Sequence, residues 1–104
     1  MLLTHINLKQ ATKLDVFEAI HKRKSAQAYE TTPVSKETLG VVLEAGRLAP
    51  SAKNIQPWHF IVVTNKDKRK TLSKGPYAKF LDEVPAAIVL CGDQEASPDW
   101  YIMD

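Results

Sequence analysis

The stretch APSAKNIQPWHF, residues 49–60, is where a helical pattern ends and a strand pattern begins. Pro50 must end the helix, because proline has no backbone N–H and clashes with the preceding turn. Small side chains at Ser51 and Ala52 would let a planar ligand approach the backbone closely. The stretch therefore predicts a loop with a binding function, held between a helix and a strand.

Amide and aromatic side chains complete this loop. Asn54 and Gln56 offer paired donors and acceptors that suit the edge of a heteroaromatic ligand. The alternative is that these amides only cap the turn, while Trp58 and Phe60 fill the core. The residues alone leave both interpretations open, although the two aromatics are better placed to anchor the following strand than to touch a ligand.

Helical patterns precede the loop. Ser35 is the expected N-cap of a helix over residues 36–48. Apolar or small residues recur on one face of that helix, at Leu39, Val42, Leu43 and Gly46. Earlier, Asp15 and Glu18 form a capping-box-like pair that predicts a short helix. Residues 1–14 show no clean period and predict an N-terminal arm, so the domain is expected over residues 15–104.

Two apolar, β-branched runs follow the loop, at residues 60–63 and 86–91. They predict two strands that are buried on both faces, with a polar helix between them over about residues 67–73. Cys91 lies in the second run and is expected in the core rather than as a nucleophile. Because two strands rarely form a stable sheet alone, we expect either a partner chain or a longer protein of which this is the front part.

Composition excludes several classes of protein. The 104 residues are 44% hydrophobic and 25% charged, as in soluble single domains, and no apolar run nears the roughly 20 residues of a membrane span, so a cytoplasmic protein is expected. Basic residues form two short clusters, at residues 21–24 and 66–70, rather than the continuous basic stripe that is typical of a nucleic-acid-binding protein. The second basic cluster is expected to be a solvated turn and the start of a helix. One cysteine and three scattered histidines give no metal-ligand spacing.

A second motif, RKSAQAY at residues 23–29, stands before the loop motif in the same order and at the same spacing as in a known family. Together the two motifs resemble the FMN-dependent nitroreductase family, from about Val16 to the end of the chain. The resemblance implies an α+β, nitroreductase-like fold of helix–sheet–helix layers, of which this chain matches roughly the first half and is therefore expected to be truncated. It also implies a homodimer of interlocked subunits that binds FMN at its interface.

The resemblance implies an FMN site in which the flavin, rather than a catalytic side chain, carries the reaction. Its cofactor-binding residues would be Arg23, Lys24, Ser25, Gln27, Ser51, Ala52 and Asn54. Arg23 and Ser25 supply a planar fork and a hydroxyl that suit a phosphate. Gln27 departs from the family, which usually has a cation there. Without the resemblance, the first basic cluster, residues 21–24, can also be explained as a solvated helix end whose cations face the C-terminal dipole.

Three functions follow, and they belong to different classes. The resemblance favours an oxidoreductase that passes electrons from NADH or NADPH through FMN to a nitroaromatic, a quinone or a similar small acceptor. The alternative is a non-catalytic fragment with weak or no FMN binding, because missing contacts would weaken the cofactor's affinity. A small nucleic-acid-binding module is disfavoured, since the chain lacks a basic surface.

Overall fold

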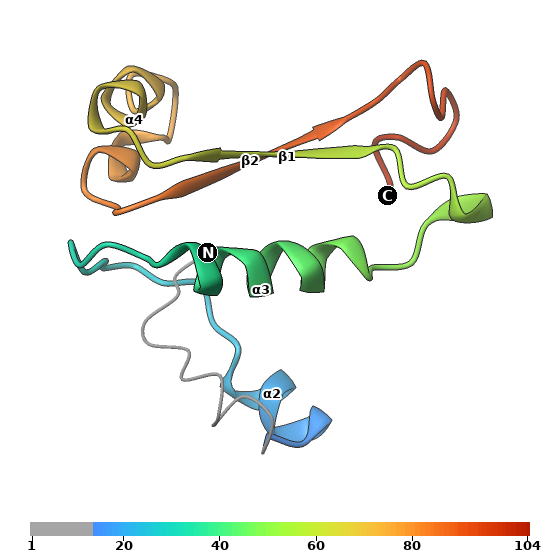
Figure 1. Ribbon diagram of the computed structural model, residues 1–104, viewed down its shortest axis with the longest axis horizontal. Helices are drawn as coiled ribbons and strands as arrows, with labels where there is room; N and C mark the ends of the chain where they lie inside the picture. Colours follow the sequence, from blue (N-terminus) through green and yellow to red (C-terminus); the bar gives the residue numbers. More distant parts are fainter. Residues whose placement is uncertain (1–13) are drawn as a thin grey trace.

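The computed structural model describes residues 14–104, so the arm expected over residues 1–14 lies almost entirely outside the described residues. Figure 1 shows a sheet above α3, with α2 on the far side of α3 from the sheet. The elements are α2 (Val16–Lys22), α3 (Lys36–Arg47), the 3-10 turn η1 (Ala52–Asn54), β1 (Trp58–Val63), α4 (Lys66–Leu72), the 3-10 turn η2 (Lys79–Asp82) and β2 (Ala87–Gly92).

Each of the three α-helices within residues 14–104 begins at a polar side chain that caps it. Asp15, Ser35 and Asn65 each accept a hydrogen bond from the backbone N–H three residues later, at 2.8, 3.1 and 3.0 Å. Such caps satisfy N–H groups that the first helical turn leaves without partners. The expected helices are therefore confirmed, and Asn65 caps the third of them, α4.

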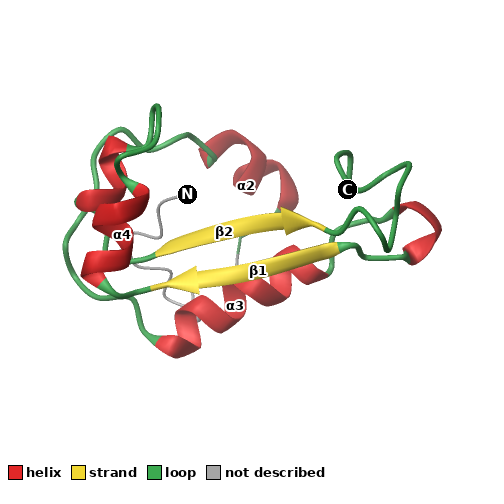
Figure 2. Ribbon diagram, turned by 90° about the horizontal axis from the view of Figure 1, so that it is seen from above, coloured by secondary structure: helices red, strands yellow, loops and turns green. Residues whose placement is uncertain are grey.

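The two expected strands are present and pair antiparallel (Figure 2). Burial of both faces, however, was wrong for the described chain: Ile61 is 51% exposed and Leu90 is 62% exposed. The reason is coverage, because α3 packs on only one face of the two-stranded sheet and covers only part of it (Figure 1). Cys91, expected in the core, is only partly buried in β2.

The core lies between α3 and the sheet. Leu39 and Val84 are buried, with 7% and 5% of their surfaces exposed. A Cβ at Gly46 would lie 3.0 Å from Cζ of Phe60, so glycine lets α3 approach the sheet closely. An apolar groove of about 790 Å³ remains between α3, the sheet and η2. The core formed by the described residues is thus small.

The second basic cluster, residues 66–70, is only partly solvated, which corrects the expectation that it is a solvated turn and helix start. Three of its lysines are exposed, but Arg69 in α4 is buried. Arg69 Nη1 donates a hydrogen bond to the Val84 carbonyl, which lies just before β2. The guanidinium therefore ties α4 to the segment that leads into the second strand.

Candidate functional site

The loop after α3 has a strained backbone. Lys53, Asn54 and Gln56 have φ angles of 54°, 55° and 55°, in the left-handed region that residues other than glycine rarely adopt. Such conformations persist only where the surrounding structure holds them, and they gather at functional sites. We refer to residues 51–56 as the binding loop.

One carboxylate and one hydroxyl hold the binding loop. Ser51 Oγ donates a hydrogen bond to Asp104 Oδ2 at 2.6 Å, and the Ala52 N–H donates to Asp104 Oδ1 at 3.1 Å. Ser51 Oγ in turn accepts from the Gln56 N–H at 2.8 Å. Figure 1 shows the C-terminal end of the chain returning to this side of the molecule.

Asp104 is a residue that the sequence analysis missed in this role. It follows an apolar and aromatic run, and no pattern in the sequence signals a contact with Ser51, 53 positions earlier. The donors of Ser51 and Ala52, both expected to face FMN, are engaged by this carboxylate.

The side-chain amides of the binding loop are available to a ligand. Asn54 and Gln56 are exposed, and within residues 14–104 neither side chain forms a hydrogen bond. An amide presents both a donor and an acceptor, so the pair could recognise the polar edge of a flat ligand. The Asn54 assignment thus has a consistent geometry, and it stays a prediction.

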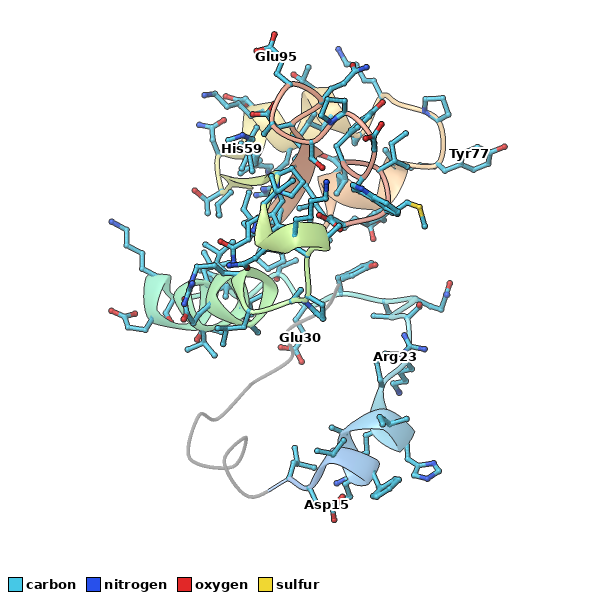
Figure 3. The ribbon with its side chains drawn as sticks, turned by 90° about the vertical axis from the view of Figure 1, so that its right-hand side faces the viewer. Asp15, Arg23, Glu30, His59, Tyr77 and Glu95 are labelled. Carbon is cyan, nitrogen blue, oxygen red and sulfur yellow. The ribbon has the colours of Figure 1, made fainter. Side chains whose placement is uncertain are left out.

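The first motif lies at the other end of the candidate site. Arg23 is the C-cap of α2, and its N–H donates to the Ala19 carbonyl at 3.1 Å. Lys24, Ser25 and Gln27 follow it in an exposed connection. Figure 3 shows Arg23 between α2 and α3, well separated from His59 in β1. One chain therefore does not bring its two motifs together.

A polar pair lies at the loop end of the sheet. His59 Nε2 is 3.3 Å from Asp93 Oδ2, and Asp93 Oδ1 accepts from the N–H groups of Glu95 and Ala96 at 3.0 Å each. The Ala96 N–H first, and then the His59 ring, hold the pKa of Asp93 below its ordinary value of 3.8. These contacts favour the ionised carboxylate and stabilise the turn that follows β2.

Asp93→Asn should remove an acid-sensitive contribution to stability. A carboxyl whose folded-state pKa is lowered stabilises the fold above its unfolded pKa, and that contribution is lost as the pH falls through the folded value. The difference in unfolding temperature between wild type and variant should therefore shrink below about pH 4. Thermal unfolding over a pH series measures it, with Asp99→Asn as the exposed control. A difference that does not change with pH in the acid range would contradict the prediction.

Other kinds of site find no support in the described part of the chain. Within residues 14–104, no group of three or more His, Cys, Asp or Glu side chains could hold a metal ion. No helix in the same residues has both the length and the apolar character to cross a membrane.

Comparison with known families gives a match over most of the chain. The model of the nitroreductase family matches residues 20–101, which include both motifs. A Methanothermobacter thermautotrophicus protein, provisionally named NADH dehydrogenase/NAD(P)H nitroreductase, is 36% identical over 103 residues, which are 96% of this chain and 53% of that protein. A Helicobacter acinonychis protein named oxygen-insensitive NADPH nitroreductase is 33% identical over 81% of this chain and 40% of its own length.

Solved structures of similar proteins share the fold of this chain. A Parabacteroides distasonis protein, provisionally named NADH dehydrogenase/NAD(P)H nitroreductase, superposes with a TM-score of 0.80 at 39% identity, over 84% of this chain and 52% of that one. An Exiguobacterium sibiricum structure, provisionally a nitroreductase and solved in complex with FMN, gives 0.71 at 32% identity over 80% and 41%. The chain spans about half the length of the first relatives it matches, at 53% and 52%.

Proposed function

The chain belongs to the nitroreductase family, and we propose that it supplies part of the FMN site of an oxidoreductase that uses NADH or NADPH to reduce nitroaromatics, quinones or similar small acceptors. The observation that carries the proposal is the family match over residues 20–101, because that range contains both candidate binding motifs. Relatives named as NAD(P)H nitroreductases and a similar structure solved with FMN support the choice of cofactor and co-substrate.

The exposed residues fit the two chemically distinct ends of FMN. Arg23, Lys24 and Ser25 combine two cations with a hydroxyl, the donors that a phosphate prefers. Asn54 and Gln56 present unpaired amides, which suit the polar edge of the isoalloxazine ring. The donor set is therefore consistent with FMN, although Gln27 offers hydrogen bonds where the family usually offers a charge.

The protein's own share of the reaction is positioning. Bound FMN would supply the redox chemistry, taking electrons from NADH or NADPH and giving them to the acceptor. The first motif would anchor the phosphate, while the binding loop would orient the ring through Asn54 and leave one face open. A pair of acid and base side chains is not needed for these tasks.

The proposed molecule is a homodimer whose two copies bring the motifs together. Within one chain the first motif and the binding loop lie apart (Figure 1). Apolar side chains are also widely exposed: Val16, Phe17 and Ile20 in α2 are 71%, 76% and 64% exposed. An apolar helix face of this kind needs a partner surface, and a symmetric dimer is the commonest way to provide one.

Light scattering should therefore give twice the monomer mass at micromolar concentration. Phe17→Asp should shift the protein toward monomer, because a charge at this apolar position would be buried against the second copy. Glu18→Gln, a polar exchange on the opposite, exposed face of the same helix, is the matched control and should leave the mass unchanged. A stable wild-type monomer at these concentrations would refute the dimer.

An absorbance spectrum tests the proposed function most directly. Protein mixed with FMN and passed through a desalting column should retain the visible flavin bands, and added NADH or NADPH should bleach them. A spectrum without flavin would instead favour the non-catalytic alternative, in which the chain keeps the motifs but does not bind the cofactor. Flavin that is retained but not bleached would leave FMN binding supported and would exclude the proposed co-substrates.

A further inference from the structure

We infer that Asp104 is a positioning residue, whose carboxylate holds the binding loop in the conformation that presents Asn54 and Gln56 to a ligand. The inference rests on the proposed function for the identity of that ligand as FMN. The geometry of the inference is independent of the proposed function, because it comes from the hydrogen bonds of Ser51 and Ala52 with Asp104.

The loop needs such a support because its backbone is strained. Three of its six residues have left-handed φ angles, and none of the three is glycine. Strain of this kind is retained only where other contacts outweigh it. The hydrogen bond from the Gln56 N–H to Ser51 Oγ closes the loop. It can hold Gln56 in place only if the Ser51 hydroxyl is itself fixed.

Asp104 fixes that hydroxyl. At 2.6 Å, the bond from Ser51 Oγ to the carboxylate is short and charge-assisted, and it directs the hydroxyl hydrogen toward Asp104. An oxygen lone pair of Ser51 is then free to accept from the Gln56 N–H. The second carboxylate oxygen accepts from the Ala52 N–H, so one side chain fixes the two adjacent residues that begin the loop.

This arrangement changes the roles expected for two residues. The hydroxyl of Ser51 and the backbone amide of Ala52 serve Asp104, whereas the side chains of Asn54 and Gln56 stay unpaired within the described chain. Ser51 therefore acts through the loop backbone, and the amide side chains make the direct contacts with the ring. The inference thus assigns ligand recognition to one part of the loop and positioning to another.

Amide hydrogen exchange in the full chain tests, without any cofactor, whether Asp104 holds the binding loop. In Asp104→Ala, the protection of the Ala52 and Gln56 amides should fall by about tenfold or more, the effect of losing a hydrogen bond to a charged group. In Ser51→Ala only the Gln56 amide should lose protection, since Asp104 still holds the Ala52 N–H. Asp99→Ala, which removes an exposed carboxylate that has no hydrogen bond within residues 14–104, is the matched control and should change neither.

Asp104→Asn provides a second route if the alanine variant unfolds, which loss of protection in β1 would reveal. Its amide oxygen can still accept from the Ala52 N–H, so Ala52 should stay protected while Gln56 loses part of its protection. Unchanged exchange at both amides in Asp104→Ala would overturn the inference that Asp104 holds the loop. Equal loss of protection at both amides in Ser51→Ala would overturn it too.

FMN titration, followed by quenching of flavin fluorescence, tests the functional half of the inference. Asp104→Ala should raise the dissociation constant about tenfold, and Asp99→Ala should leave it unchanged. Tighter binding in Asp104→Ala would overturn the inference, because it would show that the carboxylate competes with the ligand for Ser51 and Ala52. If wild type does not bind FMN, the proposed function fails, while the exchange pattern still decides whether Asp104 holds the loop.

Discussion

Arg23→Ala should weaken FMN binding by about ten- to a hundredfold, whereas Lys24→Ala should weaken it by no more than a few fold. A guanidinium can hold two phosphate oxygens in a planar fork, while a lysine ammonium acts as a mobile point charge. Arg23 closes α2 as its C-cap, so its side chain starts from a defined backbone position. Loss of one charge-assisted pair accounts for the expected range.

Fluorescence quenching of FMN, titrated with each variant at constant ionic strength, measures both affinities. Arg23→Lys is the informative intermediate, since it keeps the charge and removes the fork. It should bind more weakly than wild type. Equal losses in Arg23→Ala and Lys24→Ala would show that only total charge matters, and the assignment of Arg23 as the phosphate ligand would be wrong.

Gly92→Ala should destabilise the fold by about 1–3 kcal/mol, the usual cost of forcing an extra group into a packed site. A Cβ at Gly92 would lie 2.6 Å from the Tyr101 carbonyl oxygen, so the backbone of the C-terminal segment would have to move. That segment carries Asp104, and the same substitution should therefore also loosen the binding loop.

Gly40→Ala in α3 is the matched control, because a Cβ there meets no atom within 4 Å beyond its chain neighbours and the backbone of its own helix. Alanine has a higher helix propensity than glycine, so this variant should be stabilised by up to about 1 kcal/mol. Urea unfolding curves of the two variants give both free energies. A Gly92→Ala variant as stable as wild type would mean that Tyr101 does not pack tightly over the end of β2.

Local signals in the sequence predicted the helices well. Ser35 and Asp15 mark the start of two helices because a short polar side chain satisfies the first free N–H groups, whatever the chain does elsewhere. The face of α3 that carries Leu39 and Gly46 also follows from helical periodicity alone. Proximity in sequence suffices for such features, since the interacting groups are three or four residues apart.

The candidate site was only partly predictable. The motif residues from Arg23 to Gln27 and the loop from Ser51 to Asn54 could be found, because their residue types and spacing resemble those of a family. Their separation within one chain could not be found, and neither could the contact of Asp104 with Ser51. The burial of Arg69 was also missed, because its carbonyl partner belongs to the segment before the second strand.

By itself, the sequence determined where the helices begin, which runs form strands, and which residue types could face a flavin phosphate and ring, because these properties depend on neighbouring residues and on side-chain chemistry. Only the tertiary structure decided the antiparallel pairing of β1 with β2, the exposure of Ile61 and Leu90, and the hold of Asp104 on the binding loop. These features depend on contacts between residues far apart in the chain. Such contacts form only when the whole backbone has folded, so no local pattern encodes them.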